Sequence, residues 1–239
     1  LMDNNNASFN GIYVEADDVS IRNVIVENTS WHGIMIGSGP QKPFEPDFGT
    51  TVSNVLVEAS SVSDGLGSGI ASAGSANVEI VNSEVFGFHN GIHVERDKLE
   101  EFKGANVWVQ GNLVADNRRA GISGWKAATR VFFVANRLKG NTYCMIFSRE
   151  TENVTISGNL CDGVGTKTTS IIGISGIEFQ GVRSTGSGIL VKGNTIRNID
   201  MGRNRILTGH GIVIDAMGGV TLDSNQFINL ANSDVYTPN

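Results

Sequence analysis

The sequence is poor in proline, in cysteine and in long apolar runs. Four prolines and two cysteines occur in 239 residues, against 30 glycines. Two cysteines are too few for a disulfide framework, and no apolar run approaches the roughly 20 residues of a membrane-spanning helix. Continuous helical periodicity is absent as well. The composition therefore favours short strands joined by tight turns and predicts no membrane partner.

Positive charge is also scarce. The chain carries 18 Lys and Arg against 24 Asp and Glu, for a formal net charge of −6. Proteins that bind nucleic acid need a basic surface to neutralise phosphates. The charge balance therefore argues against a nucleic-acid partner.

A glycine followed by isoleucine recurs through the chain. The seven pairs are Gly11-Ile12, Gly33-Ile34, Gly69-Ile70, Gly91-Ile92, Gly121-Ile122, Gly176-Ile177 and Gly211-Ile212, and Met145-Ile146 fits an eighth place with methionine in the glycine's position. Each pair predicts the start of a short strand.

Two further apolar features follow each pair. An apolar-x-apolar segment predicts a second strand: Val19/Ile21, Val55/Val57, Val78/Ile80, Val107/Val109, Val131/Phe133, Val154/Ile156, Ile189/Val191 and Val220/Leu222. Seven residues beyond the first member of each lies a third inward position: Val26, Val62, Val85, Val114, Leu138, Cys161, Ile196 and Phe227. Such a repeat buries its apolar face only against its neighbours, so the sequence predicts a coil of strands. It also predicts Cys161 to be a buried free thiol.

Asparagine recurs five residues after the start of five second strands, at Asn112, Asn136, Asn159, Asn194 and Asn225. Asparagine tolerates the left-handed conformation of a sharp bend, and its amide can bond to the same residue one coil away. We expect a structural column with no catalytic role.

The three-strand turn, the Gly-Ile pairs and the asparagine column resemble the right-handed parallel β-helix of the pectin-lyase-like superfamily, over about residues 8 to 230. The resemblance implies an all-β, single-stranded right-handed parallel β-helix of about eight three-strand rungs. Residues 1–239 would form a single β-helix domain, itself a fragment or part of a larger chain or assembly. That superfamily contains polysaccharide lyases, glycoside hydrolases, epimerases, phage tailspikes and non-catalytic surface proteins. The resemblance therefore implies an extracellular or virion-associated location and leaves activity open.

Strand alternation predicts which side chains of the Gly-Ile strands leave the coil. The outward residues include Tyr13, His93, Glu95, Trp125, Phe147, Arg149, Glu178, Gln180 and Asp215, with Arg96 and Lys126 just beyond two strands. Carboxylates and arginine bind hydroxyl and carboxylate groups, and an aromatic ring offers a platform for a sugar. We expect this face to bind an extended polysaccharide, with Trp125, Lys126, Arg96, Tyr13 and Gln180 as binding residues.

Two reactions fit this set of side chains. For a hydrolase, Glu178 and Asp215 would be acid and base about 8 Å apart by strand geometry, within the range of inverting enzymes. For a lyase, His93 would remove the proton beside a uronate carboxyl and Arg149 would neutralise that carboxyl, with Glu95 alongside. No cofactor is expected, because no zinc-like cluster occurs; calcium held by Glu95, Asp97 and Glu178 is a weaker alternative. The nucleophile motif G-x-S-x-G is absent.

A second face carries aromatic side chains. Trp108 and Phe132 occupy outward positions of adjacent second strands, and exposed stacked aromatics call for a covering partner. A homotrimer or a neighbouring domain would cover them. This feature favours the alternative function, a non-catalytic receptor-binding or structural β-helix of a phage tail or cell surface.

Overall fold

The computed structural model describes residues 2–3, 10–37, 52–95, 106–125, 129–148, 151–163, 174–180, 187–200, 208–215 and 218–237. These ranges form 26 β-strands and contain no helix. Within them, accordingly, no helix is long and apolar enough to cross a membrane.

The strands form three parallel sheets. The first-strand sheet contains β2 (Ile12–Val14), β5 (Ile34–Gly37), β8 (Ser68–Ala73), β11 (Asn90–Glu95), β14 (Ala120–Trp125), β17 (Tyr143–Ser148), β20 (Ile174–Gln180), β23 (Thr208–Asp215) and β26 (Val235–Tyr236). The second-strand sheet contains β3 (Ser20–Arg22), β6 (Ser53–Glu58), β9 (Ala76–Val81), β12 (Val107–Gln110), β15 (Thr129–Val134), β18 (Glu152–Ser157), β21 (Ile189–Lys192) and β24 (Val220–Asp223). The third-strand sheet contains β1 (Met2–Asp3), β4 (Ile25–Thr29), β7 (Ser61–Gly65), β10 (Glu84–Phe86), β13 (Leu113–Ala115), β16 (Arg137–Lys139), β19 (Leu160–Asp162), β22 (Thr195–Ile199) and β25 (Gln226–Leu230).

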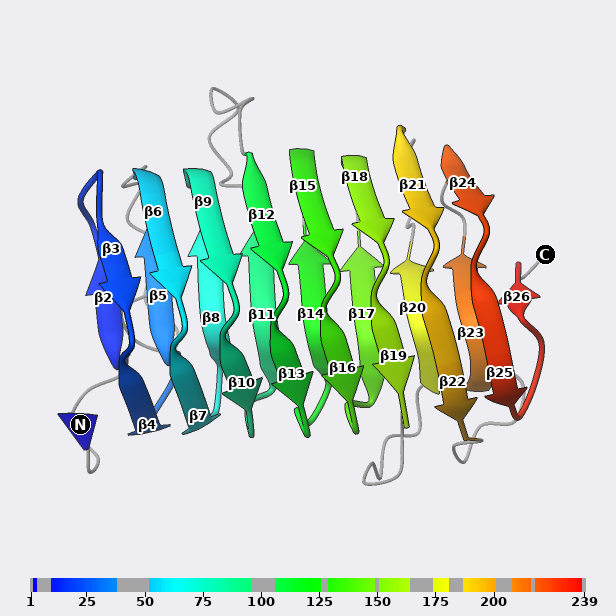
Figure 1. The fold of residues 1–239 in the computed structure, drawn as a ribbon, viewed down its shortest axis with the longest axis horizontal. Coiled ribbons are helices and arrows are strands. Elements are labelled where there is room, and N and C mark those ends of the chain that lie inside the picture. The colour runs from blue at the N-terminus through cyan, green and yellow to red at the C-terminus, as the bar shows by residue number, and fades with distance from the viewer. Residues whose placement is uncertain are drawn as a thin grey trace.

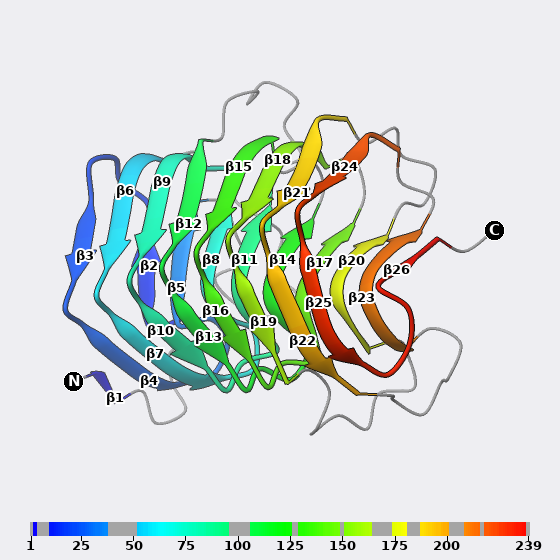
Figure 2. The ribbon, with the colours of Figure 1, turned by 45° about the vertical axis from the view of Figure 1, so that its right-hand side comes forward.

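Consecutive strands belong to different sheets, so the chain winds as a coil. Strands β2 to β25 make eight coils of three strands each, with β1 before the first coil and β26 after the last. The coils stack along the long axis, and the two ends of the chain lie at opposite ends of the stack (Figures 1 and 2). The predicted β-helix of about eight rungs is therefore confirmed.

The core lies between the three sheets and is one continuous apolar cluster. The predicted inward positions fill it, as Ile92 and Val94 of β11 illustrate, each at most 2% exposed. Aromatic rings form a column through the middle of the stack, where Phe147 packs 5.4 Å from both Phe133 and Phe179 between ring centroids. Burial of equivalent side chains in successive coils is what holds a solenoid together.

The recurring glycine is explained by a close approach within each coil. A Cβ atom at Gly121 would lie 2.7 Å from the Leu138 side chain of the third strand and 2.9 Å from the Cys144 carbonyl oxygen of the next coil. Distances that short are not tolerated between non-bonded atoms in a packed core. Glycine therefore occurs where the first strand passes the third strand of the same coil.

The strand register shows that the predicted pair Met145-Ile146 is displaced by one residue. Met145 pairs with Ile122 on one side and Ile177 on the other, so it occupies the isoleucine position and Cys144 occupies the glycine position. Cys144 is bonded to Cys161 of β19 in a disulfide with a Cα to Cα distance of 5.8 Å. The prediction of a free thiol at Cys161 is wrong, because a covalent bond replaces the glycine-to-apolar contact of the other coils.

The asparagine column is confirmed as a buried ladder. In each step the Nδ2 group of one asparagine donates to the Oδ1 atom of the next, as from Asn112 to Asn136 at 3.0 Å and from Asn136 to Asn159 at 3.0 Å. The ladder asparagines do not themselves have positive φ. The left-handed residue precedes each of them, for example Ala135 with φ of 52° before Asn136. The amide hydrogen bonds, and not the backbone conformation, therefore explain the choice of asparagine.

Candidate active site

The outer face of the first-strand sheet carries residues in columns that run along the coil axis. The first column is Tyr13, Met35, Ala71, His93, Ser123, Ile146, Glu178, Val213 and Tyr236. The second column is Gly37, Ala73, Glu95, Trp125, Ser148, Gln180 and Asp215. Adjacent members are about 4.8 Å apart, the spacing of paired strands. The predicted phase, with His93 and Glu95 outward and Ile92 inward, is confirmed.

A third row of polar side chains faces the same side and was missed from the sequence. It consists of the residues before each glycine or its equivalent, all of them polar except Ala120: Asn10, His32, Ser68, Asn90, Ala120, Tyr143, Ser175 and His210. A Cβ atom at Gly91 would meet Val114 in the core, where Ile92 also lies. Alternation is therefore interrupted at the glycine, and counting outward from the isoleucine does not reach this row. The recurrence of polar residues before the glycine is the signal that would have found it.

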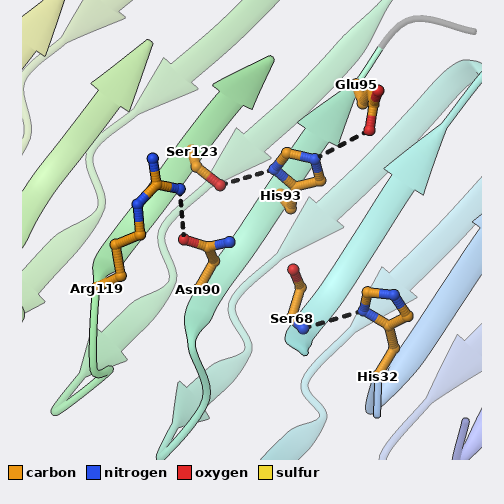
Figure 3. Close-up of polar contacts among 7 residues, drawn as sticks. All are labelled: His32, Ser68, Asn90, His93, Glu95, Arg119 and Ser123. Carbon is orange, nitrogen blue, oxygen red and sulfur yellow. Dashed lines mark hydrogen bonds and ion pairs between the residues drawn. The ribbon is translucent and has the colours of Figure 1, made fainter. Parts of the chain in front are cut away.

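His93 lies between Ser123 and Glu95 in a group of polar side chains on this face (Figure 3). Its Nδ1 atom is 2.7 Å from the Ser123 hydroxyl on the next strand, and its Nε2 atom is 3.4 Å from Oε2 of Glu95. The His93 and Glu95 side chains are 15% and 23% exposed. This arrangement holds an imidazole between a hydroxyl and a carboxylate in a partly enclosed position.

Asn90 and Arg119 flank this group. Asn90 opens the same strand as His93, and Nη1 of Arg119 donates to Oδ1 of Asn90 at 3.5 Å. Figure 3 shows both side chains on the same side of the sheet as the Ser123 hydroxyl. Within the described part of the chain Arg119 makes no ion pair with a carboxylate.

Glu178 forms a second polar group three strands away. Its carboxylate accepts hydrogen bonds from the Ser175 hydroxyl at 2.9 Å and from the Gln180 amide, and the residue is only 8% exposed. Burial raises the pKa of Tyr143 well above its usual value, and the charge of Glu178 raises it further while Arg119 opposes the shift. Tyr143 therefore keeps its phenolic proton at neutral pH.

His32 is buried in the third row beside the His93 group. Its Nδ1 atom accepts a hydrogen bond from the Ser68 backbone amide at 3.0 Å (Figure 3). Burial lowers the pKa of His32 to about 4, with a smaller contribution from the nearby His93 charge. His32 is therefore a neutral imidazole at physiological pH, with its proton on Nε2.

The structure brings together some of the predicted site residues and separates others. His93 contacts Glu95, and Glu178 contacts Gln180. Asp215 pairs with Gln180, which puts it one strand and two residues from Glu178, as expected. Tyr13 shares the column of His93 but packs against the apolar group Met35, Ala71 and Ala73 near the start of the coil.

The predicted inward and outward positions of β17 are wrong by one residue. Phe147 pairs with Gly124 and Phe179 and is fully buried, so it points inward. The outward positions of β17 are those of Ile146 and Ser148. Alternation in β17 therefore does not place Arg149 on the outer face as predicted. Arg149, Arg96 and Lys126 lie outside the described residues, and Trp125 is described only by its backbone position beside Glu95.

The outer face is also less exposed than predicted. Met35, Ile146, Glu178 and Val213 of the first column are each at most 8% exposed, whereas Asp215 of the second column is exposed. The accessible polar groups are thus concentrated in the second column and around His93.

The register argues against the suggested calcium site. Glu95 is on β11 and Glu178 on β20, three strands apart, which is roughly 14 Å at the usual strand spacing. Two ligands of one calcium ion lie about 2.3–2.6 Å from it, so these carboxylates cannot share an ion. Asp97 lies outside the described residues. In the part of the chain that the structure describes, no group of three or more His, Cys, Asp or Glu could hold a metal ion.

On the second-strand sheet, Trp108 and Phe132 stack with ring centroids 4.1 Å apart and ring planes 13° from parallel. Trp108 is 39% exposed. The predicted stacking is therefore confirmed and Trp108 is exposed as expected, whereas Phe132 is half-buried. A covering partner stays a prediction.

The family assignment follows from two overlapping matches to the model of the right handed beta helix region, over residues 3–161 and 48–227. The chain belongs to this β-helix family. The match also agrees with the predicted handedness of the coil.

Solved structures share this fold at low identity. The A-module of the mannuronan C-5 epimerase AlgE4 from Azotobacter vinelandii has a TM-score of 0.64 and 15% identity, over 93% of this chain and 63% of that one. The catalytic domain of Agl-KA has a TM-score of 0.48 and 13% identity, over 89% and 47%. The surface adhesin PfbA of Streptococcus pneumoniae has a TM-score of 0.45 and 17% identity, over 88% and 72%. This chain thus spans less than two thirds of the AlgE4 module. No curated protein sequence matches it significantly.

Proposed function

We propose that this protein is a carbohydrate-active β-helix that binds an extended, uronate-containing polysaccharide along the outer face of the first-strand sheet and cleaves it by β-elimination. The observation that carries the proposal is the alignment of His93, Ser123 and Glu178 in one column with Glu95, Gln180 and Asp215 in the next. Groups repeated at the strand spacing can contact successive units of a polymer that runs along the coil axis.

The chemistry follows from the state of the imidazole. Breaking a uronate chain by elimination requires a base for the proton next to the carboxyl group, and a cation or donor that stabilises the charge that develops there. His93 would be the base. Glu95 accepts from the Nε2 proton, so Nδ1, which contacts the Ser123 hydroxyl at 2.7 Å, is the nitrogen that would take the proton.

Arg119 replaces Arg149 in the role of the neutralising cation. It is half-buried beside Asn90 and has no carboxylate partner within the described residues. Guanidinium pairs with carboxylate in a bidentate manner, which would both orient the uronate and stabilise the developing charge.

The hydrolase version fits the geometry less well. A general acid needs a protonated carboxyl oxygen directed at the glycosidic oxygen. Both oxygens of Glu178 instead accept hydrogen bonds, from Ser175 and Gln180. Because neither oxygen of Glu178 carries a proton directed at a substrate, elimination is favoured over hydrolysis by Glu178 and Asp215.

Two further features support the proposal. The module of AlgE4 is a mannuronan C-5 epimerase, and epimerisation of a uronate at that carbon also begins with removal of the proton beside the carboxyl group. The disulfide between Cys144 and Cys161 fits an oxidising compartment and therefore an extracellular or virion-associated protein.

A non-catalytic β-helix of a phage tail or cell surface is the second candidate. The exposed Trp108 ring on the second-strand sheet favours it, because an exposed aromatic pair fits a homotrimer or a neighbouring domain covering that face. Such a protein would bind a glycan and release no product.

The test is incubation with a panel of polysaccharides that includes alginate, polygalacturonate, a glycosaminoglycan and a neutral glucan. Reducing ends together with ultraviolet absorbance of unsaturated products indicate a lyase, and reducing ends alone indicate a hydrolase. A change in the proton NMR spectrum without new ends indicates an epimerase. Binding without any of these products supports the second candidate and contradicts the proposed cleavage.

A further inference from the structure

Ser123, His93 and Glu95 form one continuous chain of polar contacts across two adjacent strands. The Ser123 Oγ atom lies 2.7 Å from Nδ1 of His93, and Nε2 of His93 lies 3.4 Å from Oε2 of Glu95 (Figure 3). The second distance is long for a hydrogen bond, as catalytic contacts often are before substrate binds. The order is hydroxyl, imidazole, carboxylate.

The roles of the two ring nitrogens follow from this order. A carboxylate only accepts hydrogen bonds, so the neutral imidazole carries its proton on Nε2 and donates it to Glu95. Nδ1 is then the acceptor for the Ser123 hydroxyl. A base held by a third group and bonded to a hydroxyl is the arrangement that activates a serine nucleophile, here with the two nitrogens exchanged relative to the usual triad.

Donors for an oxyanion flank the hydroxyl. The guanidinium of Arg119 and the amide of Asn90 lie on the same side of the sheet as Ser123 (Figure 3). Asn90 belongs to β11, which also carries His93 and Glu95, and Arg119 immediately precedes β14, which carries Ser123. Hydrogen-bond donors fixed near a nucleophile stabilise the negative oxygen of a tetrahedral intermediate.

We propose that Ser123 is the nucleophile of a second activity, hydrolysis of small acyl esters carried by the polysaccharide. It rests on the proposed function only for the identity of the polymer. Ser123 is 3% exposed, so the site suits a small acyl group such as acetyl and excludes long acyl chains.

The reaction balances with water as the only co-reactant. The Ser123 oxygen attacks the acyl carbon as His93 takes the hydroxyl proton, and the bond from the acyl carbon to the sugar oxygen breaks as His93 returns that proton to the sugar. Water then attacks the acyl-serine, giving its proton to His93, and the bond to Ser123 breaks as the serine recovers it. The products are the free sugar hydroxyl and the carboxylic acid.

The direct test is covalent labelling with methanesulfonyl fluoride, whose single methyl group is as small as that of acetyl, followed by intact-mass and peptide analysis. We expect one label, on Ser123, with no label in Ser123→Ala and labelling slowed by about 1,000-fold in His93→Gln. Ser157→Ala, on the second-strand sheet, is the matched control and should label as the parent does. An unlabelled parent protein, or a label elsewhere that survives Ser123→Ala, would overturn the proposal.

Acetate release from an acetylated polysaccharide and from p-nitrophenyl acetate gives the activity. Glu95 is a positioning residue, and Glu95→Gln should lower the rate by about 100-fold and alter the pH profile. Circular dichroism checks that each variant is folded. The labelling needs no polysaccharide, so a labelled Ser123 without polymer cleavage contradicts only the proposed elimination, and cleavage without labelling or acetate release contradicts only the esterase.

Discussion

Cys144 takes the glycine position of its coil, and its side chain is bonded to Cys161, which lies at the third-strand position that the glycine approaches in other coils. In the neighbouring coil the equivalent residues are Gly121 and Leu138, where a Cβ atom would come within 2.7 Å of the leucine. The disulfide thus lets a residue with a side chain occupy a position that otherwise admits only glycine.

Removal of the disulfide should destabilise the coil. The bond closes a loop with a sequence separation of 17, for which the chain-entropy model gives about 3 kcal/mol. We expect Cys144→Ala with Cys161→Ala to lower the free energy of unfolding by about that amount or more, because the side chain at position 144 then stays in a glycine position without its bond to residue 161. The double variant Cys144→Gly with Cys161→Leu, which copies the neighbouring coil, should be more stable than the double alanine variant. Denaturant titration measures both, and equal stabilities would contradict this explanation of the glycine position.

The asparagine ladder should be sensitive to a single truncation. Asn136 is 1% exposed, and its Oδ1 atom accepts from the Asn112 amide groups while its Nδ2 group donates to Val109 and Asn159. Asn136→Ala leaves buried groups without partners, which should cost about 2–4 kcal/mol. Asn106→Ala, which removes one exposed side-chain bond to Asn77, should change stability by less than about 0.5 kcal/mol. Similar losses in both variants would show that the buried ladder has no special role.

Repeated positions could be predicted from the sequence, and single exceptions could not. The Gly-Ile pairs determined the phase of seven first strands, because the isoleucine after each glycine marks an inward position. Strand β17 has no Gly-Ile pair, and in Cys144-Met145-Ile146 both Met145 and Ile146 fit the isoleucine position. Only the disulfide decides between them, and it depends on a contact between strands that spacing alone does not reveal.

Some residues of the candidate site could likewise be predicted from the sequence, and others could not. The outward positions of His93 and Glu95 follow from alternation within one strand, which the sequence contains. Asn90 and Arg119 join the site because strand alternation is interrupted at the glycine and because two coils lie side by side. Those are tertiary features, so strict alternation missed both residues.

His32 should make stability depend on pH. Its pKa is about 4 in the folded protein and 6.5 in the unfolded chain, so the unfolded state binds more protons between these values. As far as His32 is concerned, the free energy of unfolding is highest above pH 6.5. It decreases as the pH is lowered toward 4, by about 3 kcal/mol at most. His32→Asn, which places in this row the residue found at Asn10 and Asn90, should remove this part of the dependence. Thermal unfolding from pH 7.5 to 4 compares the two proteins, and parallel curves would contradict the low pKa.

Asp215 distinguishes the two cleavage reactions. It is exposed and lies beside Gln180, away from the His93 group. If elimination at His93 is the reaction, Asp215→Asn should lower the rate by no more than about 10-fold, through weaker substrate binding. If Glu178 and Asp215 act as acid and base, the same change should cost about 100-fold or more. The initial rate of reducing-end formation on the best substrate of the panel decides between them.

The most direct test of the proposed function is the ultraviolet absorbance of unsaturated products formed from a uronate polysaccharide by the parent protein and by His93→Gln. The account predicts a steady increase in absorbance with the parent, and a loss of about 100-fold or more in the folded His93→Gln variant. Ser157→Ala should retain the parent rate. Undiminished product formation by His93→Gln would contradict the assignment of the base and with it the proposed active site.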